Sequence, residues 1–262
     1  MRYTLFFTLL LLFSSCSSSA AGYGVIGVIG LFALMFTLFA VMFFLIAKRK
    51  KQGEKSLVKF NNDVYLALNK LNTPQQKANM LNSLIARINN DKKYAKDTEW
   101  RNKVLLKTYL HLATACYQMG DEMQTLDTCT KIIELDDNDG MAYYNRGSIY
   151  SNIGLYEKAL SDLNKTIELL PNYASAYNNR GLVHEKMEHY NEAINDFTQA
   201  IHLEESPVAY YNRGNTNYEL HKYSDALSDY REAIRRLDAD AQSELKSEIE
   251  ISINIIEDKL ED

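Results

Sequence analysis

One short phrase occurs three times in this sequence at a nearly constant interval. It occupies Tyr144–Gly147, Asn178–Gly181 and Tyr211–Gly214, and its glycines are 34 and then 33 residues apart. A fixed period of this size predicts a stack of similar helical units, none of which can bury its apolar face alone. Glycine and proline are scarce, with 11 and three in 262 residues, so little interrupts helix formation. We therefore predict an all-α solenoid of stacked helical hairpins.

The residues around the phrase follow a pattern of aromatic, small and aromatic side chains. In residues 140–173 the pattern falls on Tyr143, Gly147, Tyr150, Ala159, Leu163 and Pro171. In residues 174–206 and 207–238 it falls on Tyr177, Gly181, His184, Ala193 and Phe197, and on Tyr210, Gly214, Asn217, Ala226 and Tyr230. Residues 106–139 form a weaker unit with Tyr109, Leu112, Ala113, Cys116, Thr125 and Cys129. This pattern resembles the tetratricopeptide repeat.

The resemblance implies that the first helices of the units line a concave groove that holds a peptide or a helix of a protein partner. Carried over by position, the candidate groove residues are Tyr144, Asn145, Ser148, Asn178, Asn179, Leu182, Tyr211, Asn212 and Asn215. Asparagine amides can pair with a partner's backbone, or they can bond to the neighbouring helix and hold the stack together. A known subset of the family grips a carboxyl terminus with basic residues, but here those places hold Leu110, Thr114, Tyr144, Ser148 and Val208.

The small residues of each unit predict a close helix crossing. Gly147, Gly181 and Gly214 lie on the first helix, and they should face Ala159, Ala193 and Ala226 on the second. Small side chains on both sides let the two backbones approach. A larger side chain should overpack the crossing at a cost of about 1 to 3 kcal/mol.

An arginine precedes each of these glycines, where the family usually has a hydrophobe. Each arginine is followed 16 residues later by an aspartate, giving the pairs Arg146 and Asp162, Arg180 and Asp196, and Arg213 and Asp229. The weaker unit has Leu112 and Thr128 at the two places, so both partners are absent together. This correlation predicts three structural ion pairs that tie the two helices of each strong unit.

The amino-terminal segment carries export and membrane signals. Residues 1–21 are similar to a signal peptide, and the stretch ending at Cys16 resembles a bacterial lipoprotein signal in which that cysteine is lipidated. A cut near Ala20 or Ala21, or no cut, are the alternatives. Residues 23–47 are predicted to form one transmembrane helix, since Val25–Ala47 carries no charge and spans about 35 Å.

A basic juxtamembrane segment at residues 48–55 begins with Lys48–Lys51, and such clusters stay on the cytoplasmic side. We therefore expect a single-pass protein of the cell membrane with a cytoplasmic carboxyl-terminal domain; a periplasmic-facing protein or a lipoprotein is the alternative. Residues 56–105 are predicted to be a helical cap or degenerate repeat, and within them Asp97 is predicted to cap a helix that ends near Gly120. Residues 240–262 are predicted to be a capping helix through Leu245, Ile249, Ile253, Ile256 and Leu260.

Composition and motifs argue against several functions. Residues from 54 onward hold 24 basic and 34 acidic side chains, which disfavours nucleic-acid binding. His184 and His189 are five apart and cannot share a helix face, so they do not form a metal-binding box. We predict no catalytic site, metal or cofactor. The sequence favours a non-enzymatic, membrane-anchored scaffold; the alternatives are an envelope protein that assembles surface or cell-wall machinery, and a regulatory subunit of an enzyme complex.

Overall fold

The computed structural model describes residues 42–45, 47–48, 51, 55, 58–60, 62–90, 97–237 and 243–261. The chain divides into two compact units, residues 1–62 and 63–262. The predicted signal-like segment, Cys16 and most of the predicted span 23–47 lie outside the described residues, although residues 42–45 and 47 are helical. Within the described ranges, no helix has the length and apolar character needed to cross a membrane.

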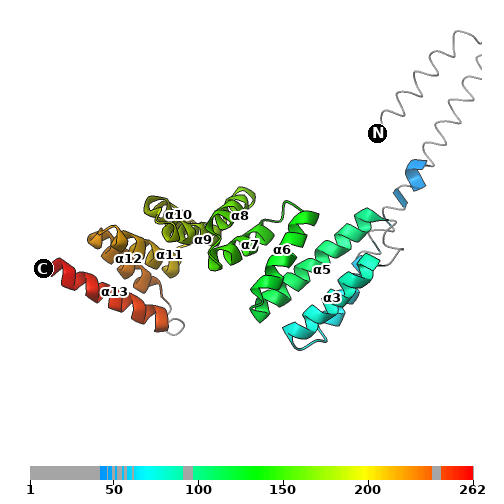
Figure 1. Cartoon of the computed structure of the whole chain (residues 1–262), viewed down its shortest axis with the longest axis horizontal. Coiled ribbons are helices and arrows are strands. Elements are labelled where there is room, and N and C mark those ends of the chain that lie inside the picture. The colour runs from blue at the N-terminus through cyan, green and yellow to red at the C-terminus, as the bar shows by residue number, and fades with distance from the viewer. Residues whose placement is uncertain are drawn as a thin grey trace, which may run out of the picture. The chain divides into compact units, whose positions relative to one another are not determined.

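The second unit is a succession of antiparallel helices (Figure 1). In this unit a helical stretch over 63–68 precedes α3 (Pro74–Asn90). The hairpins that follow are α5 (Thr98–Met119) with α6 (Glu122–Leu135), α7 (Gly140–Asn152) with α8 (Tyr156–Leu169), α9 (Ala174–Lys186) with α10 (Tyr190–Leu203), and α11 (Pro207–Glu219) with α12 (Tyr223–Arg236). The last described helix is α13 (Ser243–Glu261). All the regular structure in the described residues is helical.

Short polar side chains start several of these helices. The predicted cap Asp97 accepts a hydrogen bond from the Trp100 backbone N–H at 3.1 Å, and Asp121 and Asp139 accept in the same way at α6 and α7. Such caps satisfy N–H groups that have no partner within the helix. The hairpin α5–α6 turns at Gly120, whose φ of +69° places it in the left-handed region.

Each helix packs on the next one along the chain, and this holds both within a hairpin and between hairpins. In addition, α7 contacts α9 and α9 contacts α11, so the first helices of successive hairpins lie next to one another. The predicted boundary between residues 105 and 106 falls inside α5, which has 22 residues against 13 in α7. The additional amino-terminal turns of α5 pack on α3, and Val104 and Leu105 in this part of α5 are buried.

The helix α13 packs on α12 as α11 packs on α10. Its Ile249 and Ile256 are fully buried in a cluster with Tyr210, Tyr230 and neighbouring alanines of the last hairpin. It therefore occupies the place that a first helix of a further unit would take. Residues 240–242 and 262 of the predicted capping segment lie outside the described residues.

Candidate functional site

The helix crossings are crowded at the three glycines. A Cβ atom at Gly181 would lie 2.7 Å from the Phe197 ring, and one at Gly214 would lie 2.7 Å from the Tyr230 ring. At Gly147 the nearest atoms, which include Cγ of Leu163, would be 3.2 Å away. The facing alanines are all fully buried, namely Ala159, Ala193 and Ala226. Gly181 and Gly214 are therefore required by the rings of Phe197 and Tyr230, whereas the backbone oxygens nearest to a Cβ atom at Gly147 or Gly214, at 3.4 Å, are at ordinary contact distance.

The structure brings each predicted arginine and aspartate together in a two-pronged ion pair. The Nε and Nη2 atoms donate to the two carboxylate oxygens at 2.7 and 2.9 Å for Arg146 and Asp162, 2.8 and 2.6 Å for Arg180 and Asp196, and 3.0 and 2.6 Å for Arg213 and Asp229. The aspartates are each 5% exposed, and the arginine side chains 17 to 22%. The hydrogen bond to its aspartate raises the pKa of Arg146 and of Arg180.

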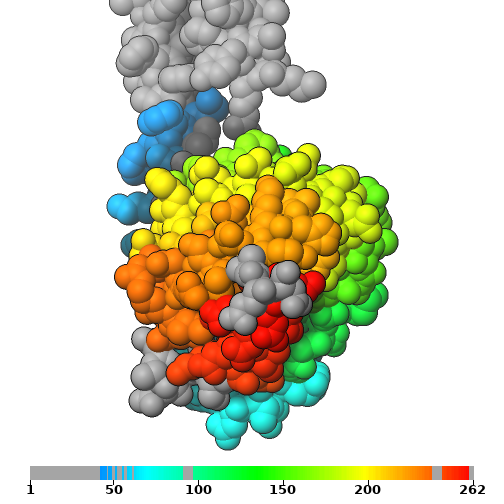
Figure 2. All heavy atoms as spheres, turned by 90° about the vertical axis from the view of Figure 1, so that its left-hand side faces the viewer, coloured from blue at the N-terminus to red at the C-terminus, as the bar shows by residue number. Residues whose placement is uncertain are grey.

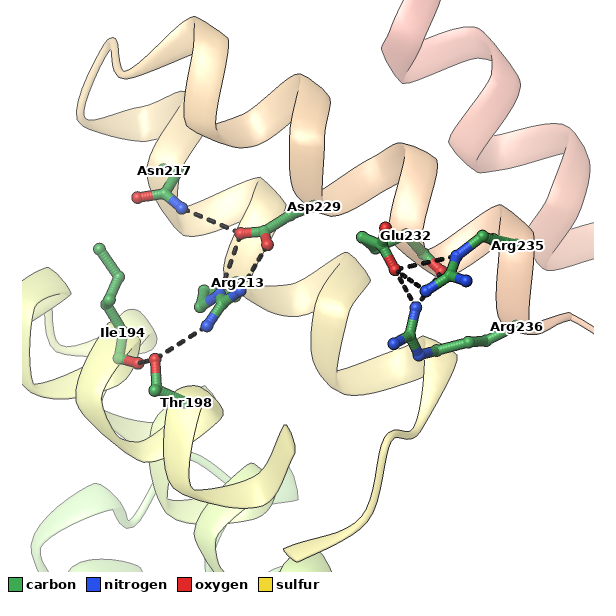
Figure 3. Close-up of polar contacts among 8 residues, drawn as sticks. All are labelled: Ile194, Thr198, Arg213, Asn217, Asp229, Glu232, Arg235 and Arg236. Atoms are coloured by element: carbon green, nitrogen blue, oxygen red, sulfur yellow. Dashed lines mark hydrogen bonds and ion pairs between the residues drawn. The ribbon is translucent and has the colours of Figure 1, made fainter. Parts of the chain in front are cut away.

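The third nitrogen of each arginine reaches the preceding hairpin. Nη1 of Arg146 donates to Oγ1 of Thr130 at 3.4 Å. Nη1 of Arg180 donates to Oδ1 of Asn164 at 2.6 Å, and Nη1 of Arg213 donates to Oγ1 of Thr198 at 3.1 Å. Figure 3 shows the last of these, with Arg213 between Asp229 and Thr198. Each arginine also lies 5.6 Å from the centre of a tyrosine ring, that of Tyr143, Tyr177 or Tyr210. One side chain thus joins three helices.

We refer to this arginine, its aspartate and the preceding acceptor as the stacking clip. The sequence prediction missed the third member, although a polar residue stands 15 or 16 residues before each arginine. In the last hairpin, Arg231 stands at the position that corresponds to the acceptor of the stacking clip. Its Nη2 donates to Oε1 of Glu257 on α13 at 2.8 Å. The direction of charge is reversed there, because the cation lies on the earlier helix.

The hairpin α5–α6 has no clip of this kind. Leu112 and Thr128 take the two places, are 2% and 1% exposed, and the Thr128 hydroxyl donates to the Gln124 carbonyl at 2.7 Å. Cys116 and Cys129 are also buried, and burial raises the pKa of their thiols to about 11 and about 12. Both thiols are therefore protonated and unreactive at neutral pH.

Most of the predicted groove side chains bond to one another. Asn179 Nδ2 donates to the Tyr144 hydroxyl at 3.1 Å and to Ser148 Oγ at 2.9 Å, which links α9 to α7. Asn212 Nδ2 donates to Asn178 Oδ1 at 2.9 Å, which links α11 to α9, and Tyr230 donates to Asn215 Oδ1 at 2.7 Å. These contacts support the interpretation that the asparagines hold the stack together. Among the candidates, Asn145, Leu182 and Tyr211 have no hydrogen bond from their side chains to other described residues, and they are half-buried.

His184 has an incomplete set of partners. Its Nε2 lies 3.9 Å from Oδ2 of Asp196, and its buried Nδ1 has no hydrogen-bond partner in the part of the chain described. Burial lowers the pKa of this imidazole, and Arg180 and His189 lower it further against the opposing effect of Asp196. At the matching place in α11, Asn217 Nδ2 donates to Asp229 at 3.1 Å. No three His, Cys, Asp or Glu residues in the described ranges form a group that could hold a metal ion.

The tetratricopeptide repeat family model matches residues 141–173 and 174–207, so the chain carries tetratricopeptide repeats at these positions. The structure is similar to that of MamA from Desulfovibrio magneticus RS-1, with 19% identity, a TM-score of 0.55, and coverage of 68% of this chain and 94% of that one. This likeness confirms the predicted all-α solenoid.

Two other solved structures have lower scores. A thermophilic tetratricopeptide repeat protein of Thermus thermophilus has 17% identity and a TM-score of 0.48, and the match covers 78% of this chain and 98% of that chain. YrrB, described as a tetratricopeptide repeat protein with an unusual peptide-binding site, has 19% identity and a TM-score of 0.47 over 61% and 82% of the two chains. No curated protein matches the sequence.

Proposed function

We propose that this protein is a non-enzymatic scaffold that binds a protein or peptide partner along the row of first helices α7, α9 and α11. The observation that supports the proposal is the adjacency of these helices. Their half-buried residues Tyr144, Leu182 and Tyr211 are the ones that we expect a partner to contact. Aromatic and apolar side chains supply contact area at low entropic cost, and the bonded asparagines keep that surface rigid. A preorganised surface loses less entropy when a partner binds.

We propose further that residues 23–47 anchor the scaffold in the cell membrane with its repeats on the cytoplasmic side. The support is the uncharged run from Val25 to Ala47, followed at once by Lys48–Lys51. An anchored scaffold raises the local concentration of its partner at the bilayer surface.

Site-specific photo-crosslinking tests the binding role. A photoreactive amino acid is placed at Leu182 or Tyr211 in the full chain, and at the exposed Gln199 on α10 as a matched control. We expect one crosslinked protein from the first two positions that is absent from the control. Equal labelling from all three positions would count against binding at this surface.

Protease access in intact cells tests the anchor. Cytoplasmic repeats should resist added protease until the membrane is permeabilised. Digestion of the repeats in intact cells would refute the proposed orientation. Release of the full chain from membranes by high salt alone would refute the span.

A further inference from the structure

The outward face of α13 carries two exposed apolar side chains. Ile251 and Ile255 are 57% and 45% exposed and stand four residues apart, so they lie on the same side of the helix. Figure 2 views this end of the chain, with α12 and α13 on the near face. The other face of α13 buries Ile249 and Ile256 against the last hairpin. In the repeats, a first helix packs on a second helix of its own hairpin, and no described residue does this for α13.

A hollow of about 190 Å³ adjoins these isoleucines. It lies between α11 and α13 and is lined by Asn215, Tyr218, Glu219, Tyr230, Ser252 and Ile255. It is open to solvent on one side and can therefore accept a side chain of a partner. The apolar pair and the hollow form one continuous surface through Ile255. We call this the α13 surface.

The charge around the α13 surface is acidic. Glu248 lies three residues before Ile251, Asp258 lies three after Ile255, and Glu219 lines the hollow. All three are exposed, and none is within ion-pair distance of a cation in the described part of the chain. Of the nearby lysines, Lys246 lies 3.9 Å from Glu250, and Lys259 lies against the rings of Tyr218 and Tyr223. A partner's basic side chains would therefore meet unpaired carboxylates.

The same charges disfavour a second copy of this chain as the occupant. In an antiparallel pair that matches Ile251 with Ile255 of the other copy, Glu248 would face Asp258. In a parallel pair, each acid would face itself. Like charges at a contact oppose association, whereas complementary charges favour it.

We infer that the α13 surface binds an amphipathic helix of a partner protein that has two apolar residues four apart and a Lys or Arg beyond each of them. The apolar pair packs on Ile251 and Ile255, and the cations face Glu248 and Asp258. A neighbouring side chain of the helix enters the hollow beside Tyr218. The inference rests on the proposed function in that it places a partner segment at the end of the same row of first helices.

Two synthetic helical peptides test this inference with the full 262-residue chain in a nonionic detergent. The basic probe has two leucines four residues apart, each with a lysine three residues outside it, in an Ala/Gln background. The acidic probe has glutamates in place of the lysines. Fluorescence anisotropy should show binding of the basic probe and little of the acidic one. Ile251→Ser with Ile255→Ser should weaken binding about tenfold or more, because two apolar contacts are lost.

The charge-reversed variant, Glu248→Lys with Asp258→Lys, should lose the basic probe and bind the acidic one. Met123→Ser, at an exposed methionine of α6, is the matched control and should bind like the wild type. Circular dichroism checks that each variant keeps its helices, and the gain of acidic-probe binding cannot come from unfolding. Equal binding of both probes, or no effect of the charge reversal, would overturn the inference.

Sedimentation and a Leu182→Ala variant distinguish this inference from dimer formation and from binding in the proposed groove. A dimer in sedimentation that Ile251→Ser dissociates would show that a second copy covers the surface, and it would also overturn the inference. Leu182→Ala should leave the basic probe's affinity unchanged. Probe binding without crosslinking from Leu182 would therefore count only against the proposed groove, and crosslinking without probe binding only against the α13 surface.

Discussion

The hairpins α5–α6 and α9–α10 are both pairs of packed helices, but the side chains between the two helices differ. In α9–α10, Gly181 faces the Phe197 ring, and Arg180 pairs with Asp196. In α5–α6, Ala113 takes the place of the glycine, Cys129 that of the phenylalanine, and Leu112 with Thr128 that of the ion pair. Volume is exchanged between facing positions, so a larger residue on one helix accompanies a smaller one on the other.

The two interiors differ in whether a buried ion pair joins the helices. A buried pair loses hydration on both charges and gains their attraction, and these two effects largely cancel, so an apolar replacement of both partners is often neutral. Removing one partner alone is costly, because the other charge stays behind. The pair therefore contributes the position and orientation of the two helices more than net stability.

The largest effect is expected from Asp196→Ala. It leaves the Nε and Nη2 donors of Arg180 without acceptors in a mostly buried place, so we expect a loss of about 3 kcal/mol in the free energy of unfolding. Urea unfolding followed by circular dichroism measures it. Asp127→Ala, at an exposed aspartate of α6, is the control and should change stability by less than about 0.5 kcal/mol. Equal stability of the two variants would contradict a buried pair.

A smaller loss is expected from Gly181→Ala. The new Cβ would meet the Phe197 ring at 2.7 Å, and overpacking of this kind costs about 1 to 3 kcal/mol, offset in part by about 1 kcal/mol of helix propensity. Gly147→Ala faces the flexible Leu163 at 3.2 Å and should cost less. The same urea titration compares them. If Gly147→Ala were the more damaging, the aromatic ring would not be what requires the glycine.

His184→Asn should reduce the sensitivity of stability to acid. Burial lowers the folded-state pKa of His184 below its ordinary value of 6.5, so the unfolded chain binds the proton more readily. Its contribution is therefore intact above pH 6.5 and is lost as the pH falls through 6.5 toward the folded-state pKa. Asparagine, as at Asn217, carries no proton equilibrium. Melting temperatures at pH 7.5 and 5.0 should differ less in the variant; an unchanged difference would exclude His184 as a source.

The smallest effect is expected when both members of the pair are exchanged for those of α5–α6. The free energy of unfolding of the double variant Arg180→Leu with Asp196→Thr should stay within about 1 kcal/mol of the wild-type value. This holds although removal of the Asp196 carboxylate alone is costly. A double-mutant cycle in urea gives the coupling between the two sites. A double variant as unstable as Asp196→Ala would show that the α5–α6 interior does not transfer to this hairpin.

The sequence predicted the hairpins, the glycine crossings and the partners of the arginines. These features repeat with the period and join positions 16 residues apart, so a single chain contains three examples and one exception. The acceptors at Thr130, Asn164 and Thr198 escaped prediction, because they differ in type and belong to the preceding unit. The sequence did predict the extent of α5, from its cap at Asp97 to its end near Gly120, although the unit boundary drawn between residues 105 and 106 falls inside that helix.

The groove residues show a different limit. An asparagine amide offers both a donor and an acceptor, so its position in the sequence does not decide between a partner and a neighbouring helix. The hydrogen bonds of Asn179 to α7 and of Asn212 to α9 show that these two amides bond to a neighbouring helix. Exposed residues such as Ile251 and Ile255 are likewise part of an ordinary amphipathic pattern until the buried face of their helix is known.

The contact between Arg231 and Glu257 sets a rule for lengthening the array. A unit inserted between α10 and α11 finds an uncharged acceptor at Thr198 for its arginine, whereas one inserted after α12 would bring its arginine against Arg231. Like charges repel, so the second insertion is disfavoured unless Arg231 changes as well, but solvent screens this repulsion because the Arg231 side chain is 63% exposed. Addition of a repeat is thus easier inside the array than at its carboxyl-terminal boundary, and the charge of Arg231 is the cause of that difference.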